Sequence, residues 1–177
     1  KTLTMLKLPT DLPTITNLGT SNGVETHLTD IYLGQNTRNL TGESFYLFPE
    51  LKNIHFDKDS NYYKVINGAL YTKNMDRLVF IPPKTGLQTL VLDDNVRIID
   101  RYALNGNKVV KKITANNIDS LDCWFGFDSS LVEEVEFGGT ATKVGGNAFT
   151  GAFRLGKIVL PPTITTIESR SFENIQA

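Results

Sequence analysis

The sequence predicts a mainly β repeat solenoid, a curved stack of units of about 23 residues with short helical or irregular bends and one inserted β-meander. Three observations support this fold class. An apolar motif recurs along the chain at a nearly constant interval, and most residues between its copies are turn formers. One longer interval contains a strong hairpin signal.

The recurring motif has the form Leu-x-x-Ile-x-Leu, with apolar substitutions, and it occurs seven times. Its middle residues are Leu6, Ile31, Ile54, Leu90, Ile113, Val135 and Ile158. The intervals between them are 25, 23, 36, 23, 22 and 23 residues. A unit of this length cannot bury an apolar face alone, so successive units must stack and share one core.

Within a unit, the motif predicts a short strand whose side chains alternate between the core and solvent. Ile158 should point inward, and Lys157 and Val159 outward. A turn, a second short extended piece and a compact bend should follow, and a small residue before a bulky one marks the bend, as in Ala148-Phe149. Truncating a central anchor such as Ile158 to alanine should cost roughly 2–5 kcal/mol.

The longer interval contains the insert, which we expect over residues 57–86. Asn67-Gly68 separates two apolar runs, which is a strong signal for a two-residue hairpin. Pro82-Pro83 ends a third run. The sequence therefore predicts a three-stranded meander inside a single solenoid that spans residues 1–177. Both ends of the chain fall inside a repeat, so we expect a longer array or protein.

Composition and charge are those of an ordinary globular chain. Hydrophobic residues make up 40% and charged residues 21% of the sequence, and the formal net charge is −1. This balance gives no electrostatic reason to expect nucleic acid or an anionic membrane as a partner. No apolar run approaches the roughly 20 residues that span a bilayer, and no signal peptide is visible. Membrane attachment would need an anchor that has been removed.

Three stretches carry a resemblance to a known family. These are "VGGNAFTGAFRLGKIVLPPTITTI" at 144–167, "LTGESFYLFPELKNIHF" at 40–56 and the insert "NYYKVINGALYTKNMDRLVFIPP" at 61–83. They resemble the BspA-like leucine-rich repeats of bacterial surface proteins. The resemblance implies a leucine-rich-repeat-like solenoid, a secreted or cell-surface location and adhesion to host molecules. It supplies no catalytic residue.

The chain departs from the family pattern in two places. Ala152 stands where the family often has a cysteine, and the repeat that contains "LDCWFGFDSS" at 121–130 has no clean Ala-Phe pair. The bend of that repeat should therefore be irregular.

Residues for catalysis or cofactor binding are scarce, so we expect none of either. The two histidines, His27 and His55, have no metal-ligand spacing to Cys, Asp or Glu. Cys123, the single cysteine, lies among apolar and aromatic residues with no neighbouring base, as a buried structural thiol would.

Residues 57–61, "DKDSN", begin like a calcium-binding loop. Such a loop needs Gly at its sixth position and Glu at its twelfth. Tyr62 and Gly68 stand there instead, so we expect an ordinary polar turn and no metal site.

The outward-facing positions of the repeated strand are the best candidates for ligand binding. By alternation they form two columns across the stacked units. One column is Lys7, Tyr32, His55, Val91, Thr114, Glu136 and Val159, and the other is Met5, Asp30, Asn53, Thr89, Lys112, Glu134 and Lys157. From them we select as candidates Tyr32, His55, Val91, Lys112, Thr114, Glu134, Glu136 and Lys157. The alternative is that Lys112, Glu134 and Lys157 only form a ladder of opposite charges, and that the face is decoration.

The sequence thus favours a non-enzymatic, surface-displayed recognition module that binds a protein or a glycan. A structural spacer in a longer surface protein is the alternative. An enzyme is the least favoured class.

Overall fold

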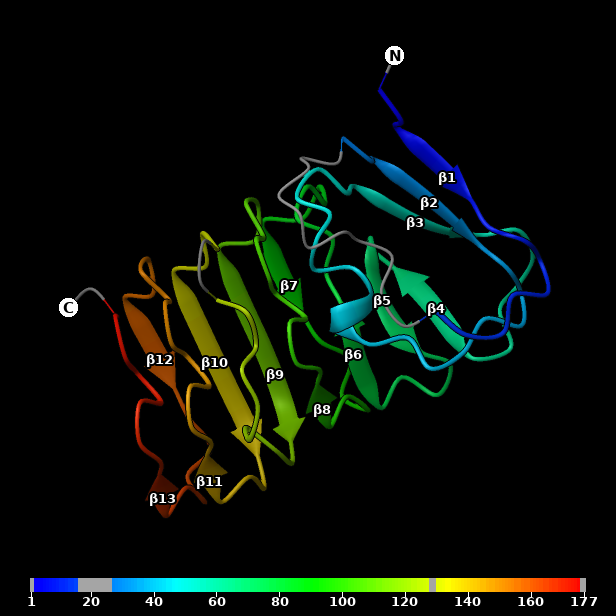
Figure 1. The fold of residues 1–177 in the computed structure, drawn as a ribbon. Helices are drawn as coiled ribbons and strands as arrows, with labels where there is room; N and C mark the ends of the chain where they lie inside the picture. Colours follow the sequence, from blue (N-terminus) through cyan, green and yellow to red (C-terminus); the bar gives the residue numbers. More distant parts are fainter. Residues whose placement is uncertain (1, 16–26, 128–129, 176–177) are drawn as a thin grey trace.

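The computed structural model describes residues 2–15, 27–127 and 130–175 and shows a coiled, almost entirely β chain (Figure 1). Its strands are β1 (Met5–Lys7), β2 (Asp30–Leu33), β3 (Asn53–Phe56), β4 (Tyr63–Ile66), β5 (Ala69–Thr72), β6 (Arg77–Phe80), β7 (Thr89–Val91), β8 (Ile98–Ile99), β9 (Lys112–Ile118), β10 (Glu134–Gly139), β11 (Lys143–Val144), β12 (Lys157–Val159) and β13 (Thr166–Ile167). One 3₁₀ helix, η1 (Gly42–Ser44), lies between β2 and β3. The described residues contain no α-helix.

The motif strands form two parallel sheets, which confirms the predicted solenoid. The N-terminal sheet has the order β1-β2-β3, and the C-terminal sheet has the order β12-β10-β9-β7. In the first sheet Leu6 aligns with Ile31, which aligns with Ile54. In the second, Leu90, Ile113, Val135 and Ile158 align in the same way. The near-constant interval therefore sets the register of each sheet.

The second extended piece of each unit forms another parallel stack. Leu78 of β6 pairs with Ile99 of β8, and Val144 of β11 pairs with Ile167 of β13. Single bridges link Ile98 to Ser120 and Leu121 to Val144, which connects β8 to β11. The chain therefore coils as strand, turn, short strand and bend.

A column of phenylalanines fills the interior at the bends. Phe125 packs against Phe149 at a ring-centroid distance of 5.8 Å, and Phe149 stacks on Phe172 at 5.3 Å. Phe45 stacks at 5.3 Å on Phe80, which comes from the inserted segment. The repeat without an Ala-Phe pair supplies Phe125, so its bend keeps the aromatic ring that the sequence pattern obscures.

The segment predicted as a meander contains β4, β5 and β6, which pair antiparallel in that order. Both faces of β5 are buried: Leu70 packs into an N-terminal core, whereas Ala69 and Tyr71 pack into a C-terminal core. β6 also pairs with β8 in parallel. The meander is therefore a sheet between two cores, and through β8 it continues one wall of the solenoid. The alternation pattern of the sequence did not predict that the meander would be part of this wall.

Ile158 is less deeply buried than the sequence suggests. It is only partly buried, whereas Ile113 and Val135 have no exposed surface. The reason is that β12 is the last strand of its sheet, so no further described unit covers its far side.

Candidate functional site

The structure places the predicted strand-face residues as the alternation requires. Tyr32 aligns with Lys7 on one side and His55 on the other. In the C-terminal sheet, Val91, Thr114, Glu136 and Val159 form one row, and Thr89, Lys112, Glu134 and Lys157 form the other. Binding by these residues remains a prediction.

On the N-terminal sheet, Tyr32 and His55 form a compact aromatic pair. Their rings stack at 4.4 Å with an interplanar angle of 16°. The His55 Nε2 atom donates to Asp30 Oδ1 at 2.9 Å, and the Asn53 side-chain amide donates to the same oxygen at 2.9 Å. The imidazole of His55 is therefore held by a hydrogen bond from β3 to β2, and Tyr32 stacks on it.

Asp30 anchors this group. The hydrogen bond from His55 lowers the pKa of the Asp30 carboxyl, and a second bond from the Thr29 hydroxyl, at 2.7 Å, acts in the same direction. The carboxylate therefore stays ionised at neutral pH and keeps accepting these bonds. Sequence reasoning placed Asp30 in a strand-face column but did not assign it this anchoring role.

On the C-terminal sheet, four charged side chains form a closed network. The Lys112 ammonium lies 3.3 Å from Glu134 and 3.1 Å from Glu136, and the Lys157 ammonium lies 3.8 Å and 2.6 Å from the same two carboxylates. A hydrogen bond to Glu136 raises the pKa of Lys112. Hydrogen bonds from Lys157 and then Lys112 lower the pKa of Glu136. Each charge thus already has partners of opposite sign.

The candidates do not form one continuous face. No described strand pairing joins β3 to β7, and the meander lies between the two sheets (Figure 1). Tyr32 and His55 belong to one surface, and the remaining six candidates belong to the other. Val91 is the apolar member of the second group of candidates, and it is 65% exposed.

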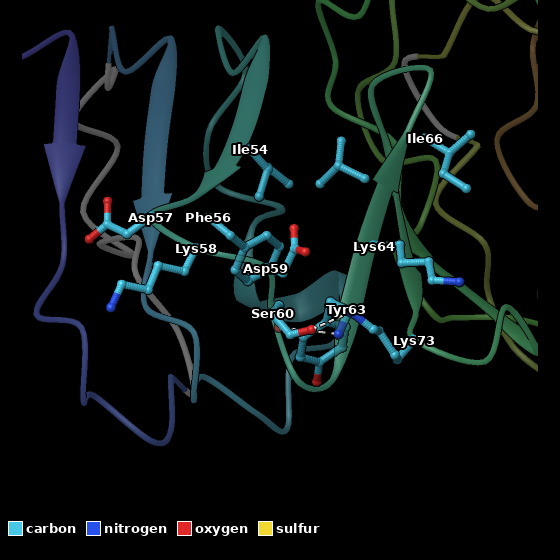
Figure 2. A pocket seen from close by; sticks show the side chains of 11 residues that line it. Ile54, Phe56, Asp57, Lys58, Asp59, Ser60, Tyr63, Lys64, Ile66 and Lys73 are labelled. Carbon is cyan, nitrogen blue, oxygen red and sulfur yellow. Dashed lines mark hydrogen bonds between the residues drawn. The ribbon is translucent and has the colours of Figure 1, made fainter.

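The structure also contains a cleft that the sequence did not reveal. It lies between β3 and β4 and has a volume of about 520 Å³. Figure 2 shows Ile54, from β3, and Asp59 on one side of the β4 ribbon, whereas the Lys64 side chain extends from its other side. Among the described strands, β3 pairs only with β2 and β4 only with β5, so two strand edges border the cleft.

Several polar groups of the cleft already have partners. The Lys73 ammonium donates to the Ser60 carbonyl at 2.7 Å, and the Ser60 hydroxyl accepts from the backbone N–H of Tyr63 at 3.2 Å. Asp57 lies 3.1 Å from the ammonium of Lys7. Both signs of charge therefore occur around this cleft, and these contacts stabilise the turn between β3 and β4.

The residues that resemble the start of a calcium loop take part in contacts between units. Asp57 pairs with Lys7, and the Asn61 amide donates to Asn36 Oδ1 at 2.9 Å. Residues 2–15, 27–127 and 130–175 contain no group of three His, Cys, Asp or Glu side chains placed to hold a metal ion.

The Cys123 thiol is poorly suited to nucleophilic chemistry. Burial raises its pKa to about 12, and its Sγ atom lies 3.4 Å from the carbonyl oxygen of Ile99. A thiol in this state is almost entirely protonated at neutral pH.

None of the helical structure in the described part of the chain has the length and apolar character needed to cross a bilayer.

Comparison with known proteins agrees with the repeat architecture of the structure. A family model described as the BspA type leucine-rich repeat region matches residues 1–85 and 83–177, with six copies. No curated protein sequence matches the chain.

Two solved structures have a similar fold. The pneumococcal vaccine antigen PcpA is 18% identical with a TM-score of 0.52, and the match covers 92% of this chain and 40% of that protein. A leucine-rich cell surface protein from Faecalibacterium prausnitzii A2-165 is 14% identical with a TM-score of 0.51, covering 89% of this chain and 60% of that protein. The chain therefore spans less than two thirds of either structure, and the likeness shows the fold alone.

Proposed function

The chain belongs to the BspA-type leucine-rich repeat family, and from this premise we propose that it is a non-enzymatic recognition module. It is displayed outside a bacterial cell and binds a host or environmental protein or glycan. A similar solved structure is described as a cell surface protein, which supports this location. An extended, stacked solenoid gives a surface suited to a large partner.

The Tyr32–His55 pair is the observation that carries this proposal. Its rings are stacked, the His55 side chain is 38% exposed, and Asp30 fixes the imidazole. A rigid, amphipathic aromatic group loses little conformational entropy when a partner covers it. Tyrosine is also enriched among the residues that dominate binding energy at interfaces. The N-terminal sheet therefore supplies the principal contact surface.

The C-terminal sheet contributes less binding energy in this proposal. Lys112, Glu134, Glu136 and Lys157 neutralise one another, so a ligand would have to compete with existing ion pairs. Exposed pairs of this kind contribute only about 0–1 kcal/mol each to stability. Val91 and Thr114 lie beside the network and extend the contact area.

The same charge network favours a second function, that of a structural spacer. The charges of this surface are already paired within the chain, so a ligand is not required to neutralise them. The chain also spans only part of the two similar structures, so recognition can lie elsewhere in a longer protein.

The test is a titration of the purified, monomeric protein over immobilised matrix proteins and glycans. The Tyr32→Ala/His55→Ala variant should bind its ligand at least about 30-fold more weakly, because the two rings form one contact. Its unfolding free energy should change by no more than about 1 kcal/mol, because both side chains lie on the solvent side of the sheet. Thermal denaturation measures that change.

Phe153→Ala is a matched control, because it removes an exposed aromatic side chain from a bend far from the N-terminal sheet. It should bind like the wild type. Saturable binding that survives in the double variant would reject the Tyr32–His55 surface. Absence of saturable binding across the panel would favour the spacer.

A further inference from the structure

A second pocket lies where the N-terminal coils meet the meander. It has a volume of about 490 Å³, within the range of small-molecule sites. One wall is the segment from Arg38 to Thr41, just before η1. The opposite wall comes from Tyr62 and Tyr63 at the start of β4 and from Arg77 at the start of β6.

The charge of this pocket is one-sided. Two arginines line it, Arg38 and Arg77, and no carboxylate among residues 2–15, 27–127 and 130–175 does. The Arg38 side chain is exposed and has no ion pair or side-chain hydrogen bond within the described parts of the chain. The cleft between β3 and β4, by contrast, is lined by both aspartates and lysines. A chain with net charge −1 therefore concentrates positive charge here.

Two acids near Arg77, Asp76 and Asp100, already make contacts within the chain. Asp100 lies beneath Arg77, with Oδ1 at 3.4 Å from the guanidinium. Asp76 accepts from the Thr72 hydroxyl at 2.5 Å and from the Asn74 amide at 2.9 Å. Arg77 is thus held by a buried partner and remains 41% exposed, so its other N–H groups can bind a ligand.

Neutral polar and aromatic groups complete the lining. Asn39 and Thr41 add an amide and a hydroxyl, and the side chain of Tyr62 is an aromatic surface with 42% exposure. The Tyr63 hydroxyl accepts from the backbone N–H of Leu40 at 2.8 Å and so ties the two walls together. The pocket is therefore formed before any ligand arrives.

We propose that this Arg38–Arg77 pocket binds a sugar that carries an anionic group, either a sulfate or a carboxylate. Guanidinium groups bind such oxygens through paired, charge-assisted hydrogen bonds. The amide and hydroxyl suit sugar hydroxyls, and Tyr62 offers an apolar surface to the sugar ring. The volume exceeds the need of a bare inorganic ion.

This site is separate from the Tyr32–His55 surface, because none of its lining residues belongs to β1, β2 or β3. Failure of one proposal therefore leaves the other standing, and the two sets of variants distinguish them.

The experiment is a calorimetric titration of the wild-type protein with a sulfated disaccharide. Parallel titrations use a uronic-acid disaccharide without sulfate, a neutral disaccharide, inorganic sulfate and an aspartate-rich peptide at equal ionic strength. We expect one site for either anionic disaccharide. Arg38→Gln should weaken that binding at least about tenfold, because a charge-assisted contact is lost.

Arg154→Gln is the matched control, because it removes the same charge from an exposed arginine in the segment before β12. It should bind within about twofold of the wild type, and unchanged melting would show that both variants fold. Equal affinity of the Arg38→Gln variant and the wild type would overturn the proposal. So would equal or tighter binding of the neutral disaccharide, of inorganic sulfate alone or of the peptide.

Discussion

At the scale of single residues, Asp100 is a buried carboxyl in an unfavourable setting. It is 8% exposed, its Oδ1 lies 3.4 Å from Arg77, and its Oδ2 has no hydrogen-bond partner. Burial raises its pKa to about 6, and Arg77 opposes that shift. A buried charge with an incomplete set of partners reduces the stability of the fold.

The raised pKa predicts how stability depends on pH. The folded state holds the Asp100 proton up to about pH 6, whereas an unfolded chain releases it near pH 3.8. Between these values the folded state binds more protons, so this residue's contribution to the unfolding free energy falls as pH rises. The loss amounts to about 3 kcal/mol by pH 7.

Denaturant unfolding of the wild type and Asp100→Asn at several pH values between 3 and 7 measures this contribution. The free-energy difference, wild type minus variant, should fall across that range. Taking this difference cancels the contributions that other carboxyls make to the pH dependence of the unfolding free energy. Asp30 is one of them, and its lowered pKa acts in the opposite direction. A free-energy difference that stays constant between pH 3 and pH 7 would contradict the account.

Cys123 gives a second prediction at the residue scale. Burial raises its thiol pKa to about 12, so the native protein holds very little thiolate at pH 8. Alkylation by iodoacetamide should therefore be at least about 100-fold slower in the native protein than in the denaturant-unfolded chain. Mass spectrometry of quenched samples measures both rates, and similar rates would show that the thiol is accessible and ionised.

At the scale of elements, the motif strands differ in how well the stack covers them. Ile113 lies in β9, between β7 and β10, and has no exposed surface. Ile158 lies in β12, the last strand of the sheet, and is only partly buried. Equivalent motif positions therefore contribute unequally to the unfolding free energy.

Alanine substitutions should show this difference. Ile113→Ala removes fully buried methylenes and should lower the unfolding free energy by about 2–5 kcal/mol, with Ile158→Ala costing clearly less. Urea denaturation of both variants gives the two values. Equal losses would mean that β12 is covered as well as β9 in solution.

The strand registers could be predicted from the sequence because a constant interval leaves one alignment of motif with motif. The two-sided burial of β5 could not. A short apolar run such as 69–72 shows that a strand is buried, but not that Leu70 and Tyr71 belong to different cores. Likewise, only the fold shows that Phe80 takes the place of a bend phenylalanine against Phe45.

At the scale of the whole molecule, the inserted meander divides the strand surface. The interval of 36 residues indicates an irregular unit, but it does not say whether the sheets on either side still pair. In the structure they do not, so Tyr32 and His55 are separated from the other candidates.

Both pockets escaped sequence reasoning for a related reason. Arg38 and Arg77 belong to different coils, and no local spacing connects them. Their approach depends on the meander packing against the N-terminal coils, which is a long-range result of folding. The columns of the strand face could be predicted because each depends only on alternation and on the repeat interval.

The central claim is that the exposed surface of the N-terminal sheet recognises a partner. The most direct measurement is NMR mapping of amide chemical shifts in the isotope-labelled protein during titration with the ligand that the panel identifies. We expect the largest changes at the backbone amides of Tyr32, Asn53 and His55, with little change in β9, β10 and β12. Changes confined to the bends, or to the C-terminal sheet, would contradict the claim.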